Sequence, residues 1–545
     1  MLTRLRFVIF TLLALMLSLT VSAQRPTPSA LTLANMTPAG VMLYASVRTD
    51  PGFIETLDGL ITRLTDSSVG LPTSNAFGGL LASEGIRGWL GDSAAVYALQ
   101  PVDLNMNEED LFGLLVEITD PIAVAAYLEE QGMTVVNKLP DGTITLTDGY
   151  STTTTLTENL LLMGGASISA LPALRGETLA DSPRFQQALT TLPAGDYPLL
   201  AYFDPSGLMT LVDPDIFEGF GEVDIPALAE SLGVFAAGMR QLDGQTYTFD
   251  IGWAFNQNAV FTALNLPEVS IPTPRPLNVD FLRVIPADAQ LVLHGGGLWS
   301  QFEAENRARS VLINALIARM VDSEMAANLS NTLPLSVSQW LNAFVELMIR
   351  GSLNLTSAQL SAALDGDSAF ALRFLILTDE RVPKLLIEPG AWFASRDNGS
   401  ADLLAGGSAL LETFGLDLTE SSDSVRFNLP DLLSDENSGN TFWQTSPMIW
   451  LATDTLTYIG ADTLTLENKE TLVAVPRITE RIAPIRPFLF DDATGFAWLD
   501  IAALSSIINE ADSSVQIAAS PFDSLFISAR QNDSGLTARF AFRLK

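Results

Sequence analysis

The sequence has no cysteine and only one histidine, His294, among its 545 residues. Without cysteine the chain cannot form disulfides, thiolate metal sites or a cysteine nucleophile, and it cannot carry a lipid on a cysteine after a signal peptide. With one histidine, a transition-metal site would have to be built from carboxylates. The stability of the fold must therefore come from packing rather than from covalent or metal cross-links.

Basic residues are also few, because 29 Lys and Arg stand against 63 Asp and Glu, for a net charge of −34. A field of that sign repels nucleic acids and anionic lipid headgroups, so we expect no nucleic-acid partner. Strong acidity occurs in disordered chains, but here 48% of the residues are hydrophobic and only 17% are charged. This composition is typical of folded domains with large cores.

Residues 1–23 have the pattern of a secretory signal peptide. Arg4 and Arg6 precede an apolar run from Phe7 to Val21, and small residues end the segment at Ala23. The run is shorter than the ~20 residues that span a bilayer, which favours cleavage. We therefore expect a secreted, periplasmic or cell-envelope protein with no membrane span after signal cleavage. Retention of the segment as an anchor is the alternative.

Two passages of the chain occur twice in the same order. Thr37 to Tyr44 and Ile285 to Leu293 both open with Pro-Ala and continue into an apolar strand. Later, Trp89 to Leu99 and Leu364 to Leu372 both carry Gly-Asp-Ser before apolar residues. Repetition in a fixed order predicts one structural unit used twice, so we expect two homologous repeats.

The predicted domain boundary lies between these repeats. Pro267, Pro272, Pro274 and Pro276 predict a stiff, extended linker. The length of 545 residues is also too great for a single core. The expected organisation is a signal peptide over residues 1–23, a flexible tether over 24–36, a first repeat over 37–266, a Pro-rich linker over 267–284 and a second repeat over 285–545.

Within each half, the hydrophobic pattern predicts strands and helices in succession. Apolar strands are expected at residues 41–47 and 291–294, followed by amphipathic helices at 53–64 and 302–321. Later strands end in Asp204 and Asp500, each placed to cap a helix. Alternating segments joined by polar turns predict antiparallel hairpins near the end of each half. The expected fold class is α+β, with each repeat a mainly antiparallel sheet and helices packed against it.

Three segments form a recognisable set. They are the Pro-Ala opening with its apolar strand, Asp181 to Leu189 before Leu192-Pro193, and the strand Leu200 to Asp204. Together they resemble the DUF3352 family of secreted bacterial proteins, over most of the mature chain. The second half departs from the pattern, because it has no clear counterpart of the Ser182 to Phe185 segment. The family has no assigned activity, so the resemblance implies no catalytic residue.

The motifs do not assemble a catalytic set. Ser93 and Ser368 follow Gly-Asp, as the nucleophiles of some esterases do, but such a serine needs a base. His294 has no Asp-X-X-His motif, and none of the four lysines follows a serine by three positions. We therefore predict no catalytic residue and no cofactor, with an extracellular hydrolase as the disfavoured alternative. The Gly-Asp-Ser segments are expected to be turns.

Metal binding is left open by the sequence. Two groups of acids are candidates for calcium, and they are Asp213, Asp215, Glu218, Glu222 and Asp224, and Asp365 with Asp367. Neither group follows the order of a calcium-binding loop, so a solvated acidic face is the simpler interpretation. His294 is interpreted as a strand-end residue, and the three glycines after it lack the Lys-Ser/Thr ending of a phosphate loop.

Apolar helices in the second half are the candidate ligand site, although core packing is the simpler interpretation. The residues proposed to line such a groove are Leu316, Met320, Leu341, Phe344, Val345 and Leu347. The sequence thus predicts a non-enzymatic secreted or envelope protein with a binding or scaffolding role. A carrier of an apolar ligand or lipid is the alternative, and the partner would be an apolar small molecule or an envelope protein.

Overall fold

The structure, a computed structural model, describes most of the chain beyond residue 30. The described residues are 31–50, 52–54, 88–100, 111–149, 152–165, 177–209, 223–264, 266–267, 269, 274–320, 352–377, 384–428, 443–445, 447–461, 477–511, 522–532 and 535–545. The predicted signal peptide and about half of the predicted tether lie outside these residues.

The chain folds into two units. Unit 1 comprises Met1–Pro214, Ile225–Asn256 and Ser534–Lys545, and unit 2 comprises Asp215–Asp224 and Gln257–Asp533. The last strand of the chain therefore belongs to unit 1, whereas the predicted ranges assign residues 285–545 to the second repeat. Those ranges follow sequence similarity rather than contacts, and they stay a prediction.

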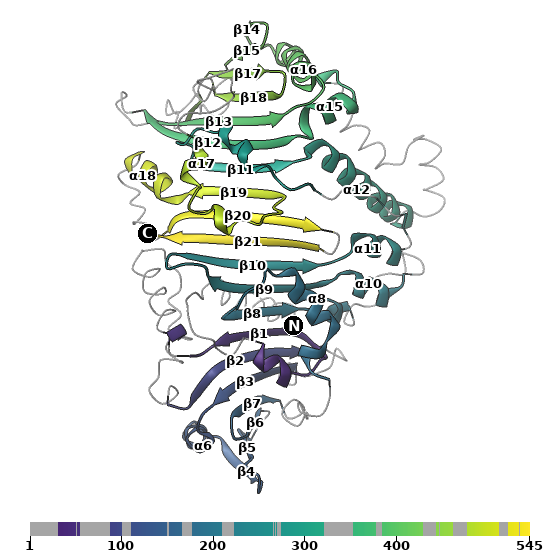
Figure 1. Ribbon diagram of the computed structural model, residues 1–545. Helices are drawn as coiled ribbons and strands as arrows, with labels where there is room; N and C mark the ends of the chain where they lie inside the picture. Colours follow the sequence, from purple (N-terminus) through teal and green to yellow (C-terminus); the bar gives the residue numbers. More distant parts are fainter. Residues whose placement is uncertain are drawn as a thin grey trace, which may run out of the picture. The chain divides into compact units, whose positions relative to one another are not determined.

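Unit 1 is built on an antiparallel sheet with helices against it (Figure 1). Its strands are β1 (Val41–Arg48), β2 (Leu90–Leu99), β3 (Phe112–Ile118), β4 (Thr134–Lys138), β5 (Ile144–Thr147), β6 (Thr152–Leu156), β7 (Leu160–Gly165), β8 (Leu199–Phe203), β9 (Val234–Gln241), β10 (Thr246–Ala254) and β21 (Gly535–Leu544). Its helices are η1 (Thr32–Met36), α6 (Pro121–Glu130), η2 (Leu179–Asp181), α8 (Pro183–Thr191), α9 (Ser206–Met209) and α10 (Ile225–Ser231). The strands pair in the order β4-β5-β6-β7-β3-β2-β1-β8-β9-β10-β21.

Unit 2 has the same kind of architecture. Its strands are β11 (Leu291–Gly296), β12 (Asp367–Leu377), β13 (Lys384–Ala394), β14 (Leu418–Glu420), β15 (Ser424–Phe427), β16 (Trp443–Thr445), β17 (Met448–Ala452), β18 (Leu456–Ala461), β19 (Gly495–Asp500) and β20 (Phe522–Asn532). Its helices are α11 (Gln257–Ala263), η4 (Val279–Val284), α12 (Leu298–Met320), α15 (Ser357–Leu364), α16 (Gly399–Thr413), α17 (Ile478–Arg481), η6 (Arg486–Phe488) and α18 (Ile501–Ala511). Antiparallel pairing runs in the order β20-β19-β11-β12-β13-β18-β17-β15-β14, and β16 pairs parallel with β13.

Helices plus antiparallel sheet make the protein α+β, as the sequence predicted. The strands expected at 41–47 and 291–294 are confirmed as β1 and β11, and the helix expected at 302–321 is confirmed as α12. The helix expected at 53–64 lies almost entirely outside the described residues. Within the described residues, no helix has the length and apolar character that crossing a membrane requires.

The predicted helix caps at the ends of two strands are confirmed. The Asp204 carboxylate accepts a hydrogen bond from the backbone N–H of Ser206 at 2.9 Å, where α9 begins. The Asp500 carboxylate accepts one from the N–H of Ala503 at 2.7 Å, in the first turn of α18. Each carboxylate thereby satisfies a backbone donor that has no partner within its own helix.

The prediction that the Gly-Asp-Ser segments are turns is wrong. Ser93 lies inside β2 and pairs with Arg48 of β1, while Ser368 lies inside β12 and pairs with Gly295 of β11. The ladder of a neighbouring strand satisfies the backbone groups that a turn would have left to the aspartate side chain.

One core cluster of unit 1 lies between the sheet and α8, and a second includes Val124 and Leu128 of α6. Phe185 of α8 is fully buried and contacts two tyrosines edge-on, Tyr44 at 6.0 Å and Tyr202 at 5.1 Å between ring centroids. Tyr44 and Tyr202 are direct cross-strand neighbours on β1 and β8. The side of the sheet that carries Tyr44 and Tyr202 is therefore the side that α8 covers. We call this side the covered face of unit 1.

Charged side chains are also buried on the covered face. Asp250 of β10 is fully buried, and its two oxygens accept hydrogen bonds from Nε and Nη2 of Arg539 on β21 at 2.6 and 3.1 Å. The same carboxylate accepts a hydrogen bond from the Tyr197 hydroxyl at 2.9 Å and lies 3.4 Å from Arg240. Two guanidiniums and a phenol thus compensate one buried carboxylate, as a charge in a low-dielectric interior requires.

Replacing Gly238 with alanine should destabilise the protein. A Cβ at this position on β9 would lie 2.3 Å from Cδ1 of the Tyr197 ring, which is buried and hydrogen-bonded. We expect the free energy of unfolding to fall by about 1–3 kcal/mol, measured by urea denaturation. Gly244→Ala, in the following turn, is the control because no atom lies within 4 Å of its Cβ. Equal effects of the two substitutions would contradict the packing described.

Replacing Arg539 with leucine should be more costly, because it leaves the Asp250 carboxylate buried with part of its compensation removed. We expect a loss of about 3–5 kcal/mol in the free energy of unfolding. Arg543→Leu on the same strand is the matched control, since the hydrogen bond from Arg543 to Gln245 is exposed and its other charge partner is Asp243 in the exposed turn. A change of under about 0.5 kcal/mol in both variants would show that the buried pair does not hold β21.

Candidate functional site

The side chains predicted to line an apolar groove all lie outside the described part of the structure. Leu316 and Met320 lie on α12, in a stretch whose side chains are not described. Leu341, Phe344, Val345 and Leu347 lie outside the described residues. The groove prediction therefore stays a prediction.

Within the described residues, Ser93 and Ser368 are not arranged as the nucleophile of a hydrolase would be. Ser93 is fully buried, and its hydroxyl has no hydrogen-bond partner among the described residues. His294 is close to Ser368, but its Nδ1 lies 2.8 Å from the Ser368 backbone carbonyl and its Nε2 lies 3.2 Å from the Asn278 carbonyl. Since both ring nitrogens face backbone oxygens, His294 is not aligned to take a proton from a serine hydroxyl.

His294 is nevertheless an unusual residue, because it is only 3% exposed. Its ring stacks on Phe281 with 5.9 Å between centroids. Burial lowers the pKa of His294 below its ordinary value, and the hydrogen bond to Ser368 and the charge of Asp367 raise the pKa by less. His294 lies within β11, two residues before the strand ends at Gly296, with Ala369 and Phe496 as its cross-strand neighbours.

Of the acidic residues considered as calcium ligands, Asp365 and Asp367 form hydrogen bonds or ion pairs with other parts of unit 2. Asp365 accepts hydrogen bonds from the N–H of Ser300 at 2.8 Å and from its hydroxyl at 2.5 Å, at the start of α12. Asp367 accepts one from the N–H of Asn278 at 3.1 Å and pairs with Arg275 at 3.6 Å. Asp224 is described, and the other acids of its group lie outside the described residues. In the described part of the chain, three or more metal-ligating side chains do not gather anywhere.

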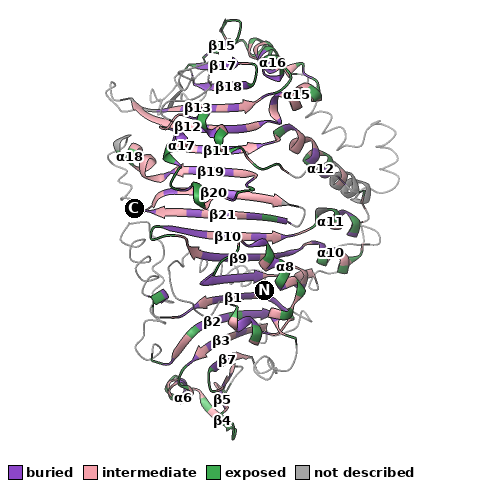
Figure 2. Cartoon of the chain, viewed as in Figure 1, coloured by how far each residue is buried: buried purple, intermediate pink, exposed green. Residues whose placement is uncertain are grey.

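The sheet of unit 1 has two faces of opposite character, visible as alternating colours along its strands in Figure 2. Side chains on the covered face are buried, and they include hydroxyls and charges such as Asp250 and Arg539. Side chains on the opposite face are apolar. Some are buried, among them Leu199, Ala201 and Met239, and others are only partly buried. Antiparallel sheets usually show the reverse, with polar residues on the solvated side.

We call this second surface the unit 1 apolar face. Its partly or fully exposed residues are Leu43, Ala45, Val96, Phe203, Phe235, Ala237, Phe249, Ile251, Trp253, Leu536, Ala538 and Phe540. Strand register places them side by side, as in the cross-strand series Phe203, Phe235, Trp253 and Leu536. Phe235 stacks on Trp253 at 5.0 Å between ring centroids, and Val96 and Leu536 are 37% and 36% exposed. None of these positions carries a charge.

Unit 2 presents a comparable surface, the unit 2 apolar face. Its residues are Leu291, Leu293, Phe370, Leu372, Ala391, Ala497, Leu499, Leu525 and Ile527. Leu293 of β11 is 42% exposed and lies between Phe370 of β12 and Ala497 of β19. Exposed apolar surface of this extent marks an interaction site more often than an unused surface.

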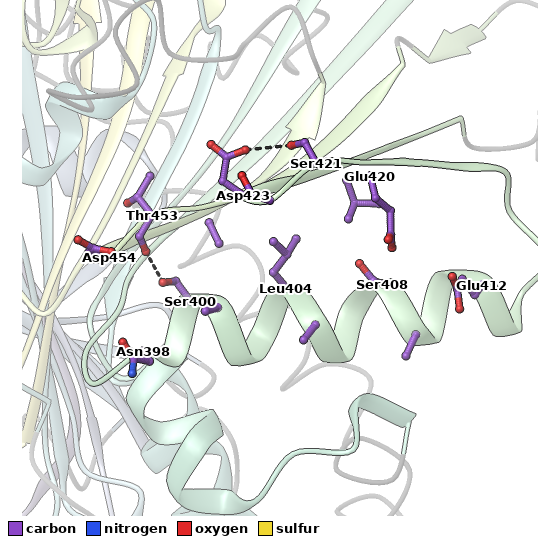
Figure 3. Close-up of a pocket in the computed structure, with 16 residues that line it drawn as sticks. Asn398, Ser400, Leu404, Ser408, Glu412, Glu420, Ser421, Asp423, Thr453 and Asp454 are labelled. Atoms are coloured by element: carbon purple, nitrogen blue, oxygen red, sulfur yellow. Dashed lines mark hydrogen bonds between the residues drawn. The ribbon is translucent and has the colours of Figure 1, made fainter.

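A separate groove of about 610 Å³ lies in unit 2 between α16 and the β14–β15 hairpin (Figure 3). Its apolar floor includes Leu404 and Val425, and serine hydroxyls line its sides. Ser400 donates a hydrogen bond to the Thr453 carbonyl, and Ser421 donates one to the Asp423 carboxylate at 2.9 Å. The groove is thus mixed in polarity, unlike the apolar faces.

Negative charge dominates the groove. Its four carboxylates are Glu412, Glu420, Asp423 and Asp454. Among its described lining residues none is Lys or Arg, so the local potential attracts cations and repels anions. The groove therefore does not suit a lipid with an acidic headgroup, and its carboxylates do not suit a purely apolar ligand either.

Comparisons with known proteins add little to this geometry. No model of a protein family matches the chain, and no curated protein matches it. Among solved structures, the chain is similar to one described as "Structure of crystal form I of TP0453", at 13% identity and a TM-score of 0.23. That match covers 46% of this chain and 89% of the other chain. A likeness at this level carries no argument, and the DUF3352 resemblance stays a prediction.

The apolar faces were missed by sequence reasoning, although a signal for them exists. In β10, Phe249, Ile251 and Trp253 alternate with Thr248 and Asp250. Such a pattern is normally interpreted with the aromatic side buried. In the structure the side of β10 with Asp250 is the buried one, because Arg539 of β21 lies opposite Asp250 and compensates its charge. This pairing cannot be predicted from the sequence of β10.

Replacing Ser93 with alanine should leave the protein at least as stable. The hydroxyl is buried and has no hydrogen-bond partner in the described part of the chain, so its removal relieves an unsatisfied group. We expect the free energy of unfolding to rise by about 1 kcal/mol in urea denaturation. Ser300→Ala is the control and should lower it, because that hydroxyl donates to buried Asp365. A loss of stability in Ser93→Ala would contradict the burial described.

Proposed function

We propose that the protein is a non-enzymatic binding protein, secreted or held in the cell envelope, that recognises a partner protein through its apolar sheet faces. The partner surface would be apolar at its centre and basic at its rim, because this chain carries a net charge of −34. The single observation that carries the proposal is the unit 1 apolar face, with uncharged and partly exposed side chains on adjacent strands.

The carrier alternative has less support. A carrier needs an enclosed apolar cavity that buries most of its ligand. The groove between α16 and the β14–β15 hairpin is lined by four carboxylates rather than by apolar side chains alone. The side chains predicted from the sequence to form a carrier site lie outside the described part of the structure. Open sheet faces suit a broad protein surface better than a small molecule.

We also propose that the two halves are homologous repeats. Similar backbone contacts support this. Pro38 forms an isolated antiparallel bridge with Thr178, and Pro286 forms one with Arg477. The N–H of Asp204 donates to the carbonyl of Met42 at 2.8 Å, and that of Asp500 donates to Gln290 at 2.8 Å. Pro38 and Pro286 stand at the same distance from Met42 and Gln290 in the sequence.

Side-chain contacts add further support. Arg184 pairs with Asp204 in unit 1, and Arg481 pairs with Asp500 in unit 2. Arg481 thereby fills the role of Arg184, although no Ser-Pro-Arg-Phe segment precedes it. The guanidinium carbon of Arg240 lies 5.1 Å from the Tyr197 ring centroid, and that of Arg530 lies 4.8 Å from the Phe490 centroid.

One detail separates this correspondence from the sequence alignment. If Met42 corresponds to Gln290, then Arg48 corresponds to Gly296. The cross-strand partner of Arg48 is Ser93, whereas the partner of Gly296 is Asp367 rather than Ser368. The Gly-Asp-Ser segments are therefore offset by one residue between the halves.

Replacing Ile251 with aspartate tests the proposed binding. Ile251 lies centrally on the unit 1 apolar face, between Ala237 and Ala538, and an aspartate there places charge in the contact. Native mass spectrometry of the protein isolated from its own compartment should show a defined complex for the wild type. We expect its occupancy to fall about tenfold or more in Ile251→Asp, the loss typical of a central interface position.

Ile122→Asp is the matched control, because Ile122 is 75% exposed on α6 and is not part of the face. Urea denaturation of each variant separates lost binding from lost folding. An unliganded wild type, or equal occupancy in folded Ile251→Asp and wild type, would refute the proposal.

A further inference from the structure

The buried histidine of unit 2 lies beneath one short part of the chain, residues 274–284, which we call the covering segment. Asn278 and Phe281 of this segment contact the His294 ring, through the carbonyl at 3.2 Å and through ring stacking at 5.9 Å between centroids. The segment is also fastened by its backbone, since the N–H of Leu277 donates to the Ala493 carbonyl at 2.7 Å. These contacts place the covering segment directly against the buried His294 ring.

The imidazole has hydrogen-bond acceptors on both sides but no anion bonded to it. A neutral imidazole carries one N–H, so it donates to only one of the Ser368 and Asn278 carbonyls. Protonation supplies a second N–H for the other carbonyl, which offsets part of the cost of burying a charge. Among the described residues no carboxylate oxygen is bonded to the ring, so within that part of the chain an imidazolium would have no direct ion pair.

The charged groups near the ring do not change this balance. Asp367 of β12 is the nearest favourable charge, but it is engaged by the Asn278 N–H and by Arg275, whose own positive charge opposes an imidazolium. On η4, Asp280 and Arg283 pair with each other at 3.2 Å and both are about half exposed. On the other neighbouring strand, β19, the cross-strand residue is Phe496, which is apolar.

We propose that His294 is an acid-operated release for the covering segment, holding it down when neutral and freeing it when protonated. The segment docks on β11 and β12 only while the imidazole can remain buried without charge. Acidification favours the state in which water solvates the imidazolium, and that state requires the segment to lift. A protein outside the cytoplasm meets such changes of pH, and His is the side chain suited to sense them.

The direction of the pH effect follows from burial. The pKa of His294 lies below the ordinary value of 6.5 while the segment is docked, and it returns toward that value when the ring is solvated. The stabilisation from neutral His294 is therefore complete above pH 6.5 and is lost as the pH falls through the lowered pKa of the docked state.

Because His294 is the only histidine, its NMR titration can be observed without assignment ambiguity in the full mature chain. We expect one ring resonance with a pKa below 6.5. A pKa at or above 6.5 in the folded protein would overturn the proposal. This measurement needs no variant, so it remains informative if substitutions at His294 impair folding.

Hydrogen exchange tests the release itself. Between about pH 7.5 and about pH 5, exchange protection of the Leu277 and Asn278 amides, which donate to Ala493 and Asp367 outside the segment, should fall about tenfold in the wild type, beyond the change seen in His294→Gln. The amides of Ala34 and Thr37, in and after η1 of unit 1, are internal controls without a histidine in their unit. The same pH dependence in wild type and His294→Gln would contradict the proposal.

Discussion

Unit 1 depends on the buried contact between Asp250 and Arg539. Because these residues lie on β10 and β21, the contact ties the last strand of the chain to a strand nearly three hundred residues earlier. It also draws in Tyr197 and Arg240, so one carboxylate organises β9, β10, β21 and the segment before β8. A buried charge with several partners tolerates little rearrangement, and this makes the sheet a rigid support.

The same contact explains the character of the opposite face. With Asp250, Thr248 and Gly252 facing the covered side, the alternation of β10 directs Phe249, Ile251 and Trp253 to the other side. Neighbouring strands follow the same register and bring apolar residues beside them. Unit 2 has buried polar residues on its covered side as well, including His294, Ser528 and Glu388. An inverted polarity of this kind is costly for a protein that contacts only water, and it is the physical basis for proposing a binding role.

The sequence predicted the fold class, several strands and the capping aspartates, because these depend on local periodicity and short-range hydrogen bonds. Asp204 and Asp500 could be assigned as caps from their places at the ends of apolar strands. Pairing over long distances could not be predicted in the same way. Nothing in the sequence near Arg481 indicates that it meets Asp500, and nothing near Ser93 indicates that it lies within a strand. The apolar faces were missed for the same reason, since which side of an alternating strand is buried depends on its distant partners.

The central claim is that the unit 1 apolar face is accessible on the isolated protein. Carbene footprinting with mass spectrometry measures this directly, because the reagent labels any exposed side chain regardless of its chemistry. We expect strong labelling of Val96, Trp253 and Leu536, and little labelling of Tyr44 and Tyr202 on the covered face. Equally weak labelling of both sets would mean that the apolar face is covered within the protein itself, and the proposed binding surface would have to be abandoned.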